Sequence, residues 1–179
     1  MVNKVLSYLR TSYGDGNFHD LTPLMRENPA EITEDSIHNL HLEGLIEMQE
    51  PSAFEELTHP RDPHPVLGRL TEKGMYFLEG NSKALAIIKA IELQHLIDII
   101  YKDEHHKEQY ITLAPYVYGK DTEERAVVWG VLPGDEDEHR RFLLDEIEIV
   151  GEPVATFTVN SEVQLSQPRN IDVVAQVKY

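Results

Sequence analysis

Residues 27–60 read ENPAEITEDSIHNLHLEGLIEMQEPSAFEELTHP, and this stretch decides the fold of the N-terminal part of the chain. Thr33 suits the N-cap of a helix, because its side-chain oxygen can accept a hydrogen bond from the first turn. Glu34 and Asp35 then favour the positive end of the helix dipole. Gly44 fits the left-handed position that follows a last helical turn. The sequence therefore predicts a helix between Thr33 and Gly44, with a strand directly behind it.

Two further helices are predicted on the N-terminal side. The first carries apolar residues at the i, i+3, i+4, i+7 spacing of one helix face, namely Val2, Val5, Leu6 and Leu9. Gly14 and Gly16 then end it. A short second helix is expected from His19 to Glu27, with its apolar side chains inward and Pro29 behind it.

A hairpin and another helix are predicted on the C-terminal side. Leu45–Gln49 and Val66–Leu70 have the composition of two strands, separated by a polar, proline-rich segment. Thr71 suits the N-cap of the next helix. Phe77 and Leu78 are expected to continue the apolar face of that helix.

Two phrases in this part resemble the winged-helix family. HNLHLEGLIEM (38–48) is similar to a recognition helix that leads into the first wing strand, and GRLTEKGMYFL (68–78) is similar to the second wing strand and its following helix. The resemblance implies sequence-specific DNA binding, with Asn39 able to pair with adenine. The resemblance also implies that the exposed positions of the third helix lie near the major groove. These positions are Glu34, Asp35, His38, Asn39, His41 and Glu43.

The charge of this stretch opposes that role. Residues 27–60 contain nine acids and no Lys or Arg, whereas contact with phosphate supplies most sequence-independent affinity for DNA. The closest basic residues are Arg26, Arg61 and Arg69. They predict weak DNA contact led by the wing. A homodimer would strengthen this contact by bringing two wings together. Docking of the acidic helix on a basic protein partner, or mimicry of DNA charge, is the alternative.

The C-terminal part is predicted to begin with a linking helix and to continue as strands. Apolar residues at helical spacing indicate the helix, namely Ala84, Ile87, Ile88 and Ile91. Short strands are expected at 96–101, 109–118, 125–132, 139–144, 154–159 and 171–179. Such a series suggests a small closed barrel or a strongly bent sheet. The predicted fold class is α+β, with one domain at residues 1–80 and a second at 81–179.

Four segments of this part resemble the WYL domain, an Sm/SH3-like β-barrel that commonly follows a winged helix in bacterial transcription regulators. They are LIDIIYK (96–102), YITLAPYVYG (110–119), RAVVWGVL (125–132) and RRFLLDEI (140–147). The match runs from about Ser82 to Val150. It implies a ligand-sensing barrel for nucleotides or nucleic acid. The chain departs from the family pattern at 126–128, which read Ala-Val-Val, and at Leu143 and Glu146, where the family has arginines.

Tyr101, Tyr116, Trp129 and Arg140 are the candidate ligand residues of the barrel. An aromatic face can stack on a base, and a guanidinium can fork onto a phosphate. Alternation along a strand puts Arg140 on the face of Phe142, with Arg141 on the other face. The alternative is that the aromatic rings fill the core and that Arg140 pairs with a carboxylate.

Composition narrows the remaining classes of function. Lys+Arg 16 against Asp+Glu 32 gives a net charge of −16, and the absence of cysteine excludes disulfides and thiolate sites. No metal or other cofactor is expected, because the pairs His59/His64 and His105/His106 match no zinc spacing. No nucleophile elbow or phosphate loop indicates an enzyme. A cytoplasmic protein without a membrane segment is predicted. The stretch 135–138 is expected to be a solvated turn, and the role of 151–179 stays open.

Overall fold

The computed structural model of the chain describes residues 1–49, 64–103, 105–151, 155–165 and 170–178. It divides into two compact units, residues 1–81 and residues 82–179. The boundary drawn from the sequence lies after residue 80. Both units combine helices with antiparallel strands, so the fold class is α+β, as predicted.

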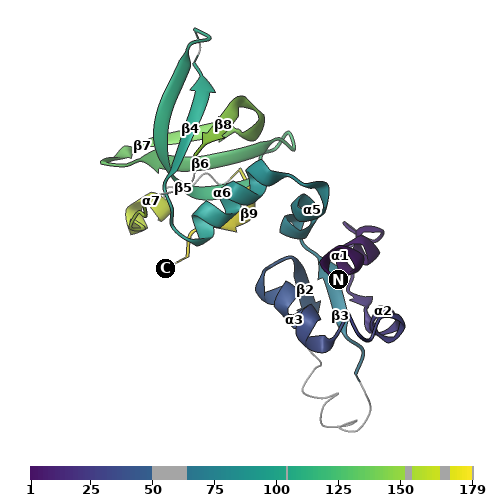
Figure 1. Cartoon of the computed structure of the whole chain (residues 1–179). Helices are drawn as coiled ribbons and strands as arrows, with labels where there is room; N and C mark the ends of the chain where they lie inside the picture. The colour runs from purple at the N-terminus through teal and green to yellow at the C-terminus, as the bar shows by residue number, and fades with distance from the viewer. Residues whose placement is uncertain (50–63, 104, 152–154, 166–169, 179) are drawn as a thin grey trace. The chain divides into compact units, whose positions relative to one another are not determined.

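The first unit is a small helical fold with a three-stranded sheet (Figure 1). Its elements are α1 (Val2–Arg10), β1 (His19–Asp20), α2 (Thr22–Glu27), α3 (Glu34–Leu42), β2 (Ile46–Gln49), β3 (Leu67–Leu70) and α5 (Glu72–Glu79). The strands lie in the order β1-β3-β2. Ile46 faces Leu70 in the antiparallel β2–β3 pair, which confirms the pairing of the two predicted strands.

Two helices begin where the sequence predicts. The side chain of Thr33 accepts a hydrogen bond from the backbone N–H of Ser36, and the Ser36 hydroxyl accepts one from the N–H of Thr33, which makes a capping box for α3. Thr71 caps α5 by accepting from the N–H of Gly74. Gly44 adopts φ 71°, a left-handed conformation that favours glycine and ends α3 before β2 begins.

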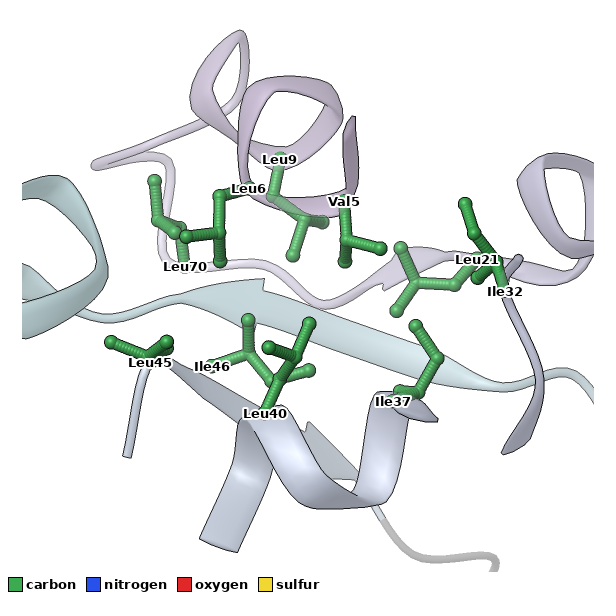
Figure 2. Close-up of a cluster of buried hydrophobic side chains, with 10 residues drawn as sticks. All are labelled: Val5, Leu6, Leu9, Leu21, Ile32, Ile37, Leu40, Leu45, Ile46 and Leu70. Atoms are coloured by element: carbon green, nitrogen blue, oxygen red, sulfur yellow. The ribbon is translucent and has the colours of Figure 1, made fainter. Parts of the chain in front are cut away.

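The hydrophobic core of this unit is formed by side chains from α1, α3 and the strands. Figure 2 shows the α1 side chains pointing toward those of α3 and the strands. The buried residues are Val5, Leu6, Leu9, Leu21, Ile32, Ile37, Leu40, Leu45, Ile46 and Leu70. The apolar periodicity of α1 is confirmed, because Val5, Leu6 and Leu9 are buried.

Two predictions in this unit are wrong. His19 and Asp20 form a strand that pairs with β3, and the helix begins only at Thr22. The Asp20 carboxylate accepts a hydrogen bond from the backbone N–H of Thr22, so Asp20 lies just before the first turn of α2 and not within the helix. Phe77 is 42% exposed, so it does not continue the apolar face of α5. The other residue predicted for that face, Leu78, is partly buried and packs against the core, and the buried residues of α5 are Gly74 and Tyr76.

The second unit is a helix on a strongly bent sheet (Figure 1). Its elements are α6 (Ser82–Glu92), β4 (Ile97–Lys102), β5 (Glu108–Lys120), β6 (Ala126–Leu132), β7 (Asp135–Leu143), a 3₁₀ turn (Leu144–Glu146), β8 (Ile147–Val150), α7 (Ser161–Leu165) and β9 (Asp172–Gln176). The strand order is β7-β6-β5-β4-β8, and β9 pairs with β5. The predicted α6 face is buried and packs on β5 and β9.

The long strand β5 bends the sheet. Its first half pairs with β4, and its second half pairs with β6 and β9, with a register shift between Pro115 and Val117. A bulge of this kind increases local twist and turns a strand. The prediction of a small Sm/SH3-like barrel is wrong, because β7 and β8 do not pair in the described part of the chain and the sheet stays open, in the form of a strongly bent sheet. The 3₁₀ turn between them carries the chain across to β4 instead of back along β7.

Other sequence predictions in this unit need correction. Asp135 belongs to β7, so the stretch expected as a turn is strand. Residue 154 of the predicted strand 154–159 lies outside the described residues, and among residues 155–159 an isolated bridge joins Thr156 to His95. The sequence did not predict β8 or α7. No helix within the described residues is long and apolar enough to cross a membrane.

Candidate functional site

The third helix presents the side chains predicted for DNA to solvent. His38 and Asn39 are exposed on α3, as are Glu34 and Asp35 in its first turn. Leu42 is 70% exposed at the end of the same helix. The exposed face is therefore acidic, with one apolar side chain at its C-terminal end.

The arginines around this helix differ in what they contact. Arg26 is exposed in the last turn of α2. Arg69 donates from Nε to Oε2 of Glu47 at 2.6 Å, and its guanidinium lies 4.8 Å from the centre of the Phe18 ring. The Glu47 carboxylate thus compensates much of the Arg69 charge. Arg61 lies outside the described residues.

A groove in the second unit brings two predicted ligand residues together. It has a volume of about 440 Å³ and lies between the end of β4 and β7. Its lining residues are Tyr101, Lys102, Asp103, His105, Arg140, Arg141, Phe142 and Glu146. The ring centroids of Tyr101 and Phe142 lie 5.0 Å apart. Tyr101 and Arg140 therefore line one groove, while ligand binding by them stays a prediction.

The other two predicted ligand residues lie in the core. Tyr116 is 1% exposed and Trp129 is 5% exposed. Their rings pack edge to face with centroids 6.1 Å apart, and Phe157 packs on Tyr116 at 5.3 Å. The Tyr116 hydroxyl accepts a hydrogen bond from the N–H of Asn160 at 2.9 Å. The structure does not bring these two rings to the groove, because they fill the space inside the bent sheet.

Carboxylates hold both arginines of β7. Arg140 pairs with Glu138 on the same strand. Arg141 donates from Nη2 to Oδ2 of Asp121 at 2.6 Å. The side chain of Asp121 is only 2% exposed, and the side chains of both arginines are 42% exposed. Pairing of Arg140 with a carboxylate is the alternative that the sequence left open.

Asp121 is the centre of a hydrogen-bond network at the β5–β6 turn. Its Oδ2 accepts from Nε and Nη2 of Arg125 at 3.0 and 2.9 Å, and its Oδ1 accepts from the backbone N–H groups of Glu123 and Arg125. Burial raises the pKa of Asp121, but the hydrogen bonds from Arg125 and Glu123 and the Arg125 charge outweigh it and lower the pKa to about 2.

The pKa of Arg125, which pairs with Asp121, depends on nearby carboxylates, and one of them lines the groove. The hydrogen bond to Asp121 raises the pKa of Arg125 against the opposing effect of burial, and the charges of Asp121, Glu123 and Glu146 act in the same direction. Glu146 therefore lies within electrostatic reach of this network. Sequence reasoning noted Glu146 as a departure from the family pattern and did not single out Asp121.

A second pocket adjoins the groove. Its volume is about 620 Å³, and it shares Tyr101, Lys102, Asp103 and Glu146 with the groove. Its other lining residues are Lys83, Ile100, His106, Glu108, Asp145, Ile147 and Glu148. Among the described residues, no three side chains of the metal-binding types lie close enough to hold an ion.

Comparison with known proteins finds likeness in structure and none in sequence. No known protein family matches the chain, and no curated protein matches its sequence. The structure shows a weak likeness to Proteasome accessory factor B/C (PafBC) of Arthrobacter aurescens, with a TM-score of 0.33 and 11% sequence identity. The alignment covers 94% of this chain and 33% of that chain, so this chain spans about a third of the length of PafBC. A likeness at this level assigns neither a family nor an activity.

Proposed function

We propose that this chain is a regulatory protein of the transcription-regulator type. In this proposal the first unit is a winged helix that acts at DNA, and the second is a WYL-like module that senses a small ligand. The proposal is supported by one observation in each unit. A strand pair directly follows α3 in the first unit, and a groove lined by Tyr101 and Arg140 opens on a bent antiparallel sheet in the second.

Binding to DNA is proposed to be weak or dependent on a partner. His38 and Asn39 face solvent on α3, but the acids of the first turn repel phosphate. Arg26 is exposed, while Arg69 is compensated by Glu47. A homodimer doubles the number of basic contacts and offsets part of this repulsion.

Ligand sensing is proposed for the groove of the second unit. Tyr101 offers a ring at the groove, and Arg140 offers a guanidinium whose present partner, Glu138, is a partly exposed carboxylate. An exposed pair of this kind contributes about 0–1 kcal/mol, so an anionic ligand can displace it. The ligand expected from the sequence is of the nucleotide type.

Arginine variants test the DNA part of the proposal. Duplex DNA is titrated at low salt into the wild type, Arg26→Ala and Arg10→Ala. Both arginines are exposed and each lies in the last turn of its helix, so the variants change the net charge equally. Arg26→Ala should weaken binding by about 1 kcal/mol or more, and Arg10→Ala by less. Equal losses would show that only overall charge matters.

A protein-docking function is the second candidate. The exposure of Leu42 on the helix that carries Glu34 and Asp35 favours it, because a helix surface with acids at one end and an apolar side chain at the other suits a basic partner with an apolar patch. Charge reversal at Glu34 and Asp35 should abolish co-purification of a basic protein. Reversal at Asp145 and Glu148, which are exposed in the second unit, is the matched control. Equal recovery with all variants would remove this candidate.

A further inference from the structure

The groove between β4 and β7 carries charges of both signs. Its cations are Lys102, Arg140 and Arg141, and its carboxylates are Asp103 and Glu146. Arg140 also faces Glu138, and Arg141 faces Asp121. Within the described residues, the groove therefore lacks the excess of positive charge that holds a polyanion. The net charge of −16 on the chain adds repulsion.

Glu146 is held in place by the backbone around it. It ends the 3₁₀ turn Leu144–Glu146. Nζ of Lys83 donates to the carbonyl oxygens of Leu144 at 3.0 Å and Ile147 at 2.7 Å, on both sides of Glu146. The Glu146 side chain is exposed and lines the groove as well as the adjoining pocket. The backbone around Glu146 is thus anchored, and its carboxylate lines the groove that Arg140 and Arg141 also line.

The aromatic part of the groove fits one ring. Tyr101 is partly buried, and its ring packs on Phe142, which is 9% exposed. The volume of about 440 Å³ is within the range of sites for single small molecules. Tyr116 and Trp129 are buried in the core. Of the predicted ligand residues with aromatic rings, Tyr101 therefore lines the groove, and it offers a stacking surface for one ring.

We infer that the groove selects small anions that carry one ring and a low charge, and that Glu146 excludes polyanions. The inference rests on the proposed ligand-sensing role of this groove. Tyr101 stacks on the ring, and the guanidinium of Arg140 exchanges Glu138 for a single phosphate or carboxylate group. Additional phosphate groups meet the charge of Glu146 and are repelled.

Calorimetric titration of the whole chain with adenosine, AMP and ATP tests this inference, because the three probes share a ring and differ in charge. AMP should bind more tightly than ATP and more tightly than adenosine. Glu146→Gln should raise the affinity for ATP about fivefold and that for AMP about twofold, since one unit charge at about 4 Å in water is worth about 1 kcal/mol.

Glu148→Gln is the matched control. It removes the same charge from an exposed side chain that lines the adjoining pocket but not the groove. It should leave the ratio of AMP to ATP affinity unchanged. Tighter binding of ATP than AMP by the wild type, or equal changes in the two variants, would overturn the role of Glu146 while ligand sensing stands.

Benzoate and phenyl phosphate separate the two anionic groups on a common ring. Binding of either probe, with loss in Arg140→Ala, supports the inference, and the tighter probe identifies the group that the groove prefers. Failure of AMP, benzoate and phenyl phosphate to bind would overturn the inference together with the ligand-sensing part of the proposed function. The DNA part would then stand or fall by its own titration.

Discussion

Asp121 and Arg141 lie 20 positions apart in the sequence, and the carboxylate of the first accepts a hydrogen bond from Nη2 of the second at 2.6 Å. Asp121 closes the turn between β5 and β6, and Arg141 lies on β7, an outer strand of the sheet. The bond therefore fastens the strand that carries Arg140 to the body of the second unit. Removal of this buried carboxylate takes a partner from two guanidinium groups, although Arg125 keeps its ion pair with Glu123.

Asp121→Asn should lower stability at neutral pH and lose this effect in acid. The pKa of Asp121 in the folded chain is about 2, below its ordinary value of 3.8. A group with a lowered folded-state pKa stabilises the fold above its unfolded value, and this stabilisation disappears as the pH falls from about 4 to about 2. Urea unfolding of the wild type and the variant from pH 7 to pH 2 measures the difference.

Asp145→Asn is the control for this experiment, because the Asp145 side chain is exposed. It should change the free energy of unfolding by less than about 0.5 kcal/mol at any pH. A constant difference between the wild type and Asp121→Asn down to pH 2 would show that the charge of Asp121 does not stabilise the fold.

Truncation of two leucines of α3 should lower stability by very different amounts. Leu40 is 1% exposed in the core of the first unit, and Leu42 is 70% exposed. Leu40→Ala should cost about 2–5 kcal/mol of unfolding free energy because it leaves a cavity. Leu42→Ala should cost less than about 0.5 kcal/mol. Equal losses in urea unfolding would contradict the orientation of α3.

Gly130→Ala should destabilise the second unit. Gly130 lies on β6, and a Cβ there would collide with the backbone oxygen of Ala114 on β5. Since backbone atoms cannot move aside as a side chain can, the expected cost is about 1–3 kcal/mol, seen as a lower melting temperature. Val173→Ala on the exposed side of β9 is the control. An unchanged melting temperature would contradict the close approach of the two strands.

Local signals made much of the fold predictable. Thr33 and Thr71 cap helices by accepting hydrogen bonds from residues three positions later, and the buried apolar residues of α6 recur at helical spacing. Such signals depend on neighbours within about one turn of chain. The two-residue strand β1 has no such pattern, because His19 and Asp20 become a strand only through pairing with β3.

The site was less predictable than the fold. Sequence reasoning selected Tyr101 and Arg140, which line one groove, but also Tyr116 and Trp129, which are buried. Periodicity cannot tell an aromatic residue in the core from one at a groove, because the bend of β5 decides which face is enclosed. The bond between Asp121 and Arg141 depends on strand order, which local sequence does not encode.

Titration of the whole chain with duplex DNA at about 20 mM and about 200 mM salt shows whether the protein acts at DNA. We expect binding at low salt that weakens steeply at raised salt. Two or three arginine contacts give a slope of log affinity against log salt of about −2 to −3. Absence of binding at low salt would contradict a role at DNA and leave the acidic face of α3 as a protein-docking surface.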